Sequence, residues 1–167
     1  MPNRYEYRRR LPHYQPDNKI FFITFCTYQR RELSEPARSI VLDVCLRGNG
    51  VLFELLGIVV MPDHVHLALK PLVTADGPVC IPRMMQAIKS TSAHRINREL
   101  GHRGTVWQQE SFDRALRREE ELDRKIDYML ENPVRAGLVR SPLNYRWMWR
   151  KTDYERARSV QFADHER

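Results

Sequence analysis

The segment from Val59 to Leu69 constrains the fold more than any other, because it is apolar enough for a buried strand and yet carries two histidines. Side chains alternate between the two faces of a strand, so His64 and His66 point the same way, with about 6.5 to 7 Å of rise between them. Val65 and Leu67 take the opposite face and can pack in a core. Two imidazoles on one face can hold a metal ion. The spacing alone fits equally well a histidine pair that bonds only water or a carboxylate.

Length and charge set the class of protein. The 167 residues suit one domain with extensions, and we expect a basic arm over 1–18, a domain over 19–140 and a tail over 141–167. An excess of basic over acidic residues gives a net charge of +7, which favours a polyanion such as nucleic acid as partner. No apolar segment follows the N-terminal arginines, so we expect a cytoplasmic, nucleoid-associated protein that binds no membrane. The three widely spaced cysteines indicate neither a disulfide framework nor a thiolate zinc site.

The first half of the chain predicts a strand, a helix and two further strands. Residues 20–27 are β-branched and aromatic enough for a strand buried on both faces. Ser34 can cap the helix that follows, and the Gly-Asn-Gly at 48–50 ends it. Residues 51–60 form a second strand. The Met-Pro-Asp at 61–63 then reads as a hairpin turn or a bulge before the histidine strand.

The second half predicts two helices joined by an extended segment. Apolar residues recur at helical spacing over 81–100, and the opposite face carries Arg83 and Ser90. That polar face is either solvated or a hydrogen-bonding surface for phosphates and bases. An extended segment runs over 106–116. A last helix spans about 119–131, where the proline at 133 disfavours its continuation.

Tyr128 lies in this last helix and faces away from the core. Helical stepping places it about 200° from Ile126, which is a core position. Asn132 follows one turn later, and Arg124 and Lys125 share the polar side, so the phenol has neighbours suited to a metal ion and to a phosphate. The alternative is a tyrosine whose ring packs while its hydroxyl reaches the surface.

Several short segments form one pattern over nearly the whole chain. They are Arg8 to Tyr14, Phe21 to Phe25, Val60 to Leu67, Trp107-Gln108, Phe112 to Arg114 and Asp127 to Val139. This pattern resembles the single-tyrosine HUH transposases, most of all the branch associated with repetitive extragenic palindromes (REP). The most specific part is the histidine pair followed by Tyr-x-x-x-Asn-Pro-Val-Arg-Ala-Gly-Leu. The resemblance implies an RRM-like or ferredoxin-like α/β (α+β) sandwich with helices packed on a central antiparallel sheet, which the element order permits.

The resemblance also implies a chemistry. Tyr128 attacks a phosphodiester of single-stranded DNA, which gives a covalent 5′-phosphotyrosine and a free 3′-hydroxyl that allows later rejoining. His64, His66 and the side-chain oxygen of Asn132 hold a divalent ion that polarises the phosphate. Ligand softness alone ranks Zn²⁺ or Mn²⁺ above Mg²⁺ on two imidazoles. The family implies Mg²⁺ or Mn²⁺, which we adopt as the expected cofactor.

Relatives bind imperfect palindromic hairpins with a short single-stranded guide, so we expect a single-stranded, REP-like hairpin DNA as partner, bound by a monomer or a homodimer. The residues expected to contact it are Arg4, Arg8, Arg9, Arg10, Arg83, Ser90, Trp107, Arg114, Arg117, Arg118 and Arg135. Two alternatives stay open: Trp107 belongs to the core, and the arginines only make the protein soluble. The segment 145–149, Tyr-Arg-Trp-Met-Trp, departs from the family pattern, which puts its C-terminal contacts in doubt.

Two other functions compete with strand transfer. One is a nucleic-acid-binding protein without catalysis, against which the intact spacing of the four site residues argues. The other is a metal-dependent phosphodiester hydrolase that activates water, which would leave no DNA linked to the protein. A denaturation-resistant adduct with labelled hairpin DNA separates these functions.

Overall fold

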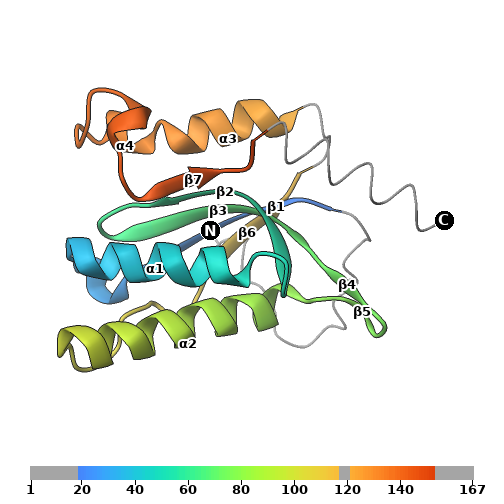
Figure 1. Cartoon of the computed structure of the whole chain (residues 1–167), viewed down its shortest axis with the longest axis horizontal. Helices are drawn as coiled ribbons and strands as arrows, with labels where there is room; N and C mark the ends of the chain where they lie inside the picture. Colours follow the sequence, from blue (N-terminus) through green and yellow to red (C-terminus); the bar gives the residue numbers. More distant parts are fainter. Residues whose placement is uncertain (1–18, 117–120, 153–167) are drawn as a thin grey trace, which may run out of the picture.

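The computed structural model describes residues 19–116 and 121–152. A five-stranded antiparallel sheet in the order β6-β1-β3-β2-β7 forms the middle layer, with α1 and α2 on one face and α3 and α4 on the other (Figure 1). This confirms the predicted sandwich around an antiparallel sheet. The elements are β1 (Phe21–Cys26), α1 (Glu35–Gly48), β2 (Phe53–Val60), β3 (His64–Pro71), β4 (Val73–Thr74), β5 (Gly77–Pro78), α2 (Ile81–Leu100), β6 (Phe112–Ala115), α3 (Leu122–Leu130), α4 (Asn132–Arg135) and β7 (Met148–Arg150).

The long helices begin and end where the sequence signals predict. The Ser34 hydroxyl accepts a hydrogen bond from the Ala37 amide at 3.3 Å and so caps α1. Helix α2 ends at Gly101, whose φ of 64° lies in the left-handed region that glycine adopts without strain. Helix α3 covers the middle of the predicted 119–131 segment.

Strands β2 and β3 form a hairpin, so the Met-Pro-Asp at 61–63 is a turn. The bulge lies within β2, where the register shifts between Leu55 and Gly57. A Cβ at Gly57 would lie 3.1 Å from the Met129 Cε and 3.3 Å from the Ile126 Cγ2. The glycine therefore lets α3 approach β2 closely, and this contact fixes the face of the sheet on which α3 lies.

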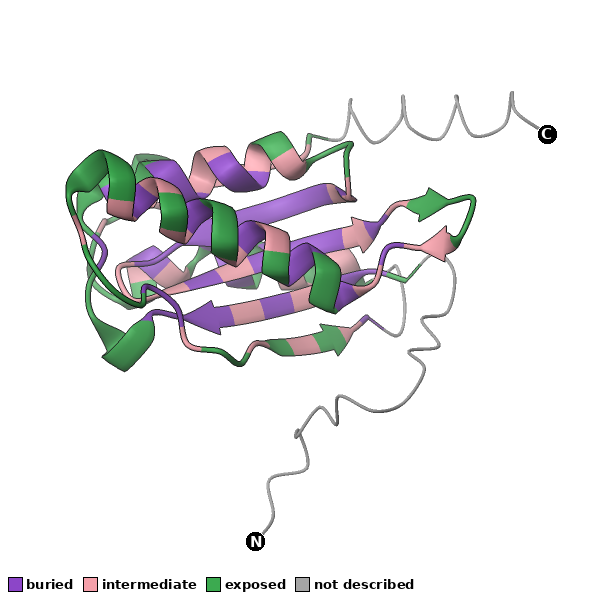
Figure 2. Ribbon diagram, turned by 90° about the horizontal axis from the view of Figure 1, so that it is seen from below, coloured by how far each residue is buried: buried purple, intermediate pink, exposed green. Residues whose placement is uncertain are grey.

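Alternation in β3 divides the sheet into two faces. We call the face with Val65, Leu67 and Phe25 the packed face, because these three side chains are fully buried. Helices α1 and α2 cover this face, and the strands beneath them are largely buried (Figure 1 and Figure 2). We call the opposite face, which carries His64 and His66, the site face. Helix α3 lies over β2 on this face. The core is thus largest on the side away from the histidines.

The C-terminal segment that departs from the family pattern packs onto the sheet. Tyr145 and Trp147 are buried, and β7 pairs with β2. The Tyr145 hydroxyl donates to the Val60 carbonyl at 2.7 Å, and the Trp147 indole donates to the Ser39 hydroxyl at 3.0 Å. These contacts fasten the chain after α4 to β2 and to α1. Within residues 19–116 and 121–152, no helix is long and apolar enough to cross a membrane.

Candidate functional site

The two histidines come together on the site face of β3. Both side chains are half-buried, and their ring centroids lie 4.7 Å apart with the ring planes at 81°. His66 lies opposite Thr24 in β1 and Val59 in β2, so a strand flanks the pair on each side. This arrangement gives two neighbouring imidazoles on a strand that is paired on both sides.

His66 is held neutral by its surroundings. Burial, followed by the charges of His64 and Arg135, lowers the pKa of His66 from 6.5 to about 4. Its Nδ1 lies 2.7 Å from the Thr24 hydroxyl oxygen. A hydrogen bond from Nδ1 to that oxygen leaves Nε2 as the nitrogen that can bind a metal ion.

His64 is oriented by the residue before it. The Asp63 carboxylate lies 2.6 Å from His64 Nδ1, and its second oxygen pairs with Arg30 at 2.8 Å. Burial opposes ionisation of Asp63, but the hydrogen bond from His64 and the charges of His64 and Arg30 outweigh it and lower the pKa of that carboxyl. The sequence predicts Asp63 only as a turn residue. Its role in orienting His64 depends on how the turn folds back, which residue spacing does not specify.

Tyr128 lies on the outer side of α3, as helical stepping predicts, and 68% of its surface is exposed. The Arg135 guanidinium lies over its ring, 3.9 Å from the centroid, and also donates to the Tyr128 carbonyl at 2.8 Å. A stacked arginine restricts the phenol ring while leaving its hydroxyl accessible.

Asn132 begins α4 and contacts the same arginine. Its side-chain nitrogen donates to the Met129 carbonyl at 2.7 Å, and its side-chain oxygen accepts from Arg135 at 3.0 Å. The charge of Arg135 also helps to lower the pKa of His66. Arg135 therefore contacts both the predicted nucleophile and the predicted third ligand, and its charge acts on His66; sequence spacing alone does not indicate this arrangement.

The donor set suits a divalent ion held by nitrogen and amide oxygen. The rings of His64 and His66 are neighbours, while the Asn132 side-chain oxygen accepts a hydrogen bond from Arg135. In the ranges 19–116 and 121–152, no group of three histidine, cysteine or carboxylate side chains is arranged to hold a metal. Both Asp63 oxygens are already bonded. The chemistry of the donor atoms fits the predicted set of two imidazoles and one amide oxygen, and Asn132 would have to leave Arg135 to serve as the third ligand.

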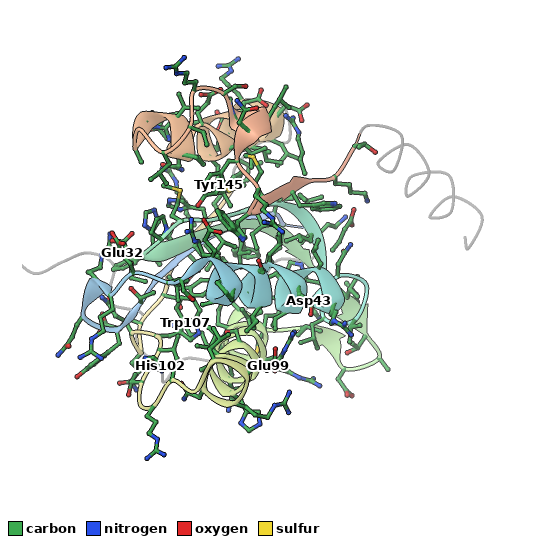
Figure 3. All side chains as sticks on the ribbon, turned by 60° about the vertical axis from the view of Figure 1, so that its left-hand side comes forward. Glu32, Asp43, Glu99, His102, Trp107 and Tyr145 are labelled. Carbon is green, nitrogen blue, oxygen red and sulfur yellow. The ribbon has the colours of Figure 1, made fainter. Side chains whose placement is uncertain are left out.

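Trp107 corrects one expectation. It is only 6% exposed, its ring meets Phe25 edge to face at 4.8 Å, and its indole donates to the buried Ser92 hydroxyl at 2.9 Å. Figure 3 shows it in the interior, beside α2. The prediction that it contacts DNA is therefore wrong for this structure, because the ring is enclosed in the packed side of the core and no base can reach its face.

The remaining predicted DNA contacts fall on two layers. Arg114 is exposed on β6 and Arg135 is exposed beside Tyr128, both on the site face. Arg83 and Ser90 are exposed on α2, in the layer that covers the packed face. One straight strand of DNA cannot lie on both layers at once. Arg4, Arg8, Arg9, Arg10, Arg117 and Arg118 lie outside the described residues.

Comparisons with known proteins point to one family. A family model described as "Transposase IS200 like" matches residues 18–119. A Haemophilus influenzae protein named as a REP-associated tyrosine transposase is 27% identical over 93 residues, which are 52% of this chain and 53% of that protein. The chain thus spans about half the length of the curated relative it matches.

Two solved structures are similar to this chain. A REP-associated tyrosine transposase described as bound to a REP hairpin superposes with a TM-score of 0.62 at 22% identity, covering 83% of this chain and 80% of that one. A Deinococcus radiodurans R1 protein described as a transposase gives a TM-score of 0.46 at 23% identity, covering 74% of this chain and 96% of that one. The first of these supports the same fold.

Proposed function

Because this chain belongs to the IS200-like transposase family, we propose that it is a strand transferase that binds single-stranded hairpin DNA of the REP type, cleaves it and rejoins it. The observation that carries the proposal is an exposed tyrosine, stacked under Arg135, in a helix on the face of the sheet that carries the two histidines. The substrate class is supported by the REP-associated names of a relative and of a protein with the same fold. A net charge of +7 suits a polyanionic substrate.

The reaction exchanges one phosphodiester for another. The Tyr128 oxygen attacks the phosphorus, the bond to the 3′ oxygen breaks, and the phenol proton is lost while the 3′ oxygen gains a proton. The products are a 5′-phosphotyrosine and a free 3′-hydroxyl. Attack by another 3′-hydroxyl reverses the step and joins strands without ATP, because the phosphotyrosine keeps the energy of the bond. Exposure of Tyr128 leaves room for the DNA strand.

The histidines act as neutral ligands in this proposal. A bound Mg²⁺ or Mn²⁺ supplies positive charge that stabilises the phosphate as it reacts. Thr24 and Asp63 each contact the Nδ1 atom of one histidine, which leaves the Nε2 atom of each ring as the nitrogen that would bind the ion. Asn132 would contribute its amide oxygen if it left Arg135, whose guanidinium would then be available to bind the phosphate.

The two layers of basic residues would contact different parts of the hairpin. Arg114 and Arg135 lie on the site face and suit the strand that is cleaved. Arg83 and Ser90, on α2, suit a portion of the hairpin that passes around the edge of the sheet.

An adduct assay tests the proposal. Labelled single-stranded hairpin DNA is incubated with the protein and Mg²⁺ or Mn²⁺, and a denaturation-resistant protein–DNA adduct is expected. Tyr128→Phe should abolish the adduct and keep hairpin affinity, while Tyr28→Phe, which changes another exposed tyrosine, should leave the adduct unchanged. Cleavage without any adduct would favour the hydrolase, and binding without cleavage would favour a non-catalytic protein.

A further inference from the structure

We propose that Phe112 is a base-binding residue: its ring stacks on a nucleobase of the single strand next to the phosphate that is cleaved. The inference rests on the proposed function for the identity of the strand and adds a subsite that the histidines and Tyr128 do not provide. Trp107, the aromatic residue predicted to stack on DNA, is buried. Phe112 is an aromatic residue of the same region whose ring is 51% exposed.

The register of the sheet places Phe112 in the same row as His66. Phe112 pairs with Thr24, and Thr24 pairs with His66, so the three side chains lie on one face across β6, β1 and β3. Two strand spacings separate Phe112 from His66, which is about 9.5 Å. A base on the Phe112 ring therefore belongs to a nucleotide close to a phosphate held at the histidines.

Among residues 19–116 and 121–152, this half of the site face carries exposed side chains at its edge. Along β6 the exposed residues alternate with half-buried ones, and both exposed residues, Phe112 and Arg114, are on the site face. Along β1, Phe22 and Thr24 are half-buried on that face, while Phe21 and Ile23 on the packed face are buried. Helix α3 covers β2, on the far side of the histidines from β6. A strand of DNA can thus lie between α3 and the β6 edge.

The charges beside Phe112 suit a phosphate backbone. Arg114 follows two residues later on the same face and is exposed. Lys125 of α3 reaches over the Phe22 ring, with 5.9 Å from its Nζ to the ring centroid. An aromatic ring with a basic residue beside it on the same strand suits the binding of single strands without reading a base edge, since every base has a face to stack.

The exposed Phe112 side chain offers an apolar surface to a ligand. Phe112 has no hydroxyl to hydrate, so its exposed ring is apolar surface that contact with a ligand would remove from water. Strand pairing along the β6 edge by another protein chain would use backbone groups, and a merely large apolar side chain would serve it equally. Stacking with a base requires an aromatic ring, and this difference can be tested.

The experiment measures the dissociation constant of Tyr128→Phe protein, which keeps the strand uncleaved, for hairpins with a single-stranded flank that carries one abasic position at a time. One flank position should weaken binding about 5- to 150-fold when its base is removed. Adding Phe112→Ala should weaken binding to the intact flank by a similar factor and abolish the effect of the abasic site at that position only. Phe112→Leu should behave like Phe112→Ala, and Phe112→Trp should restore the wild-type pattern.

Leu143→Ala is the matched control, because Leu143 is 95% exposed and lies outside the sheet. It should change neither the affinity nor the response to any abasic site. All variants should melt within a few degrees of the parent, since the changed side chains are exposed.

The inference fails if Phe112→Ala leaves the abasic pattern unchanged, if Phe112→Leu binds like the parent, or if the loss of affinity is the same for a hairpin without its flank. A Phe112→Ala protein whose oligomeric state differs from the parent would assign the ring to a protein contact instead.

The adduct assay separates the failure of this inference from the failure of the proposed function. If either of the first two failures occurs while the wild-type protein forms the adduct normally, this inference is overturned and the proposed function is kept. A Phe112-dependent abasic effect without any adduct from the wild-type protein would keep the subsite and overturn strand transfer. A wild-type protein that binds no single strand would overturn both.

Discussion

The two faces of β3 differ although they are built from alternate residues of the same strand. Val65, Leu67 and Leu69 are fully buried on the packed face. His64 and His66 are half-buried on the site face and bonded to Asp63 and Thr24. The packed face stabilises the fold through apolar contacts. The site face instead carries imidazole side chains that hydrogen bonds orient and that pack less tightly. A shift of β3 by a single residue would exchange the two sets of side chains between the faces. Burial of the apolar set therefore fixes the strand register and, with it, the positions of the histidines.

The sharpest test of this comparison uses neighbouring residues. His66→Ala should abolish cleavage and change the free energy of unfolding little, because the histidine is only half-buried and its removal leaves one threonine hydroxyl near the surface. Leu67→Ala should cost about 2 to 5 kcal/mol of stability and keep cleavage at temperatures where the protein is folded. Chemical denaturation and the adduct assay measure the two effects. Equal losses of stability in both variants would contradict the division of the sheet into two faces.

The next effect concerns the position of Tyr128. Arg135→Ala should lower the single-turnover cleavage rate about 100-fold, because the Tyr128 ring and Asn132 lose the group that holds both of them. Arg135→Lys should restore hairpin affinity but little of the rate, since an ammonium cannot stack and bond in the same planar geometry. Arg140→Ala, at an exposed arginine nearby, is the control. A wild-type rate in Arg135→Lys would reduce the role of Arg135 to its charge.

A smaller effect is expected from the residues that orient the histidines. Thr24→Val and Asp63→Ala should each weaken Mn²⁺ binding about 10- to 100-fold, because each removes the partner of one Nδ1 atom. Mn²⁺ affinity is measured by electron paramagnetic resonance in the absence of DNA. Thr74→Val, in the β4–β5 hairpin, should bind Mn²⁺ as the parent does. Unchanged affinity in the two site variants would show that packing alone orients the rings.

The smallest effect is a dependence of stability on pH. His66 has a pKa of about 4 in the folded protein and 6.5 as its ordinary value. Between these values the unfolded chain binds a proton that the folded chain does not, so the free energy of unfolding falls as the pH falls from 6.5 towards 4. His66→Gln should reduce this slope by at most about 1.4 kcal/mol per pH unit. Urea denaturation in chelator at several pH values measures the slope, and identical slopes would contradict the burial of a neutral His66.

The sequence predicts the packed face well because local signals decide it. Helical periodicity and caps place α1 and α2, and the alternation in β3 places the histidines on one side. The family predicted from the motifs is confirmed by the match over 18–119. The roles of Tyr128, Asn132 and the metal ion stay predictions that the assays above test.

What the sequence does not predict depends on contacts between distant residues. Trp107 fits a core and a stacking platform equally well by composition, and only its contacts with Phe25 and Ser92 decide. Arg135 reads as one more DNA-binding cation, because stacking on Tyr128 requires the bend between α3 and α4. The short β7 strand has little intrinsic signal, and its pairing with β2 follows from the burial of Tyr145 and Trp147.

The order of the sheet has a further consequence for Tyr128. The chain leaves β6 at one edge of the sheet, passes through α3 and α4, and returns as β7 at the opposite edge. Tyr128 therefore lies in a connecting segment, from the end of β6 to the start of β7, whose two ends are both held in the sheet. Lifting it far from the histidines requires detaching β7 from β2, together with the Tyr145 and Trp147 fastenings. Residues inserted between Ala136 and Ser141 would lengthen this connecting segment without disturbing β6 or β7. The length of this stretch therefore limits how far Tyr128 can move from the histidines.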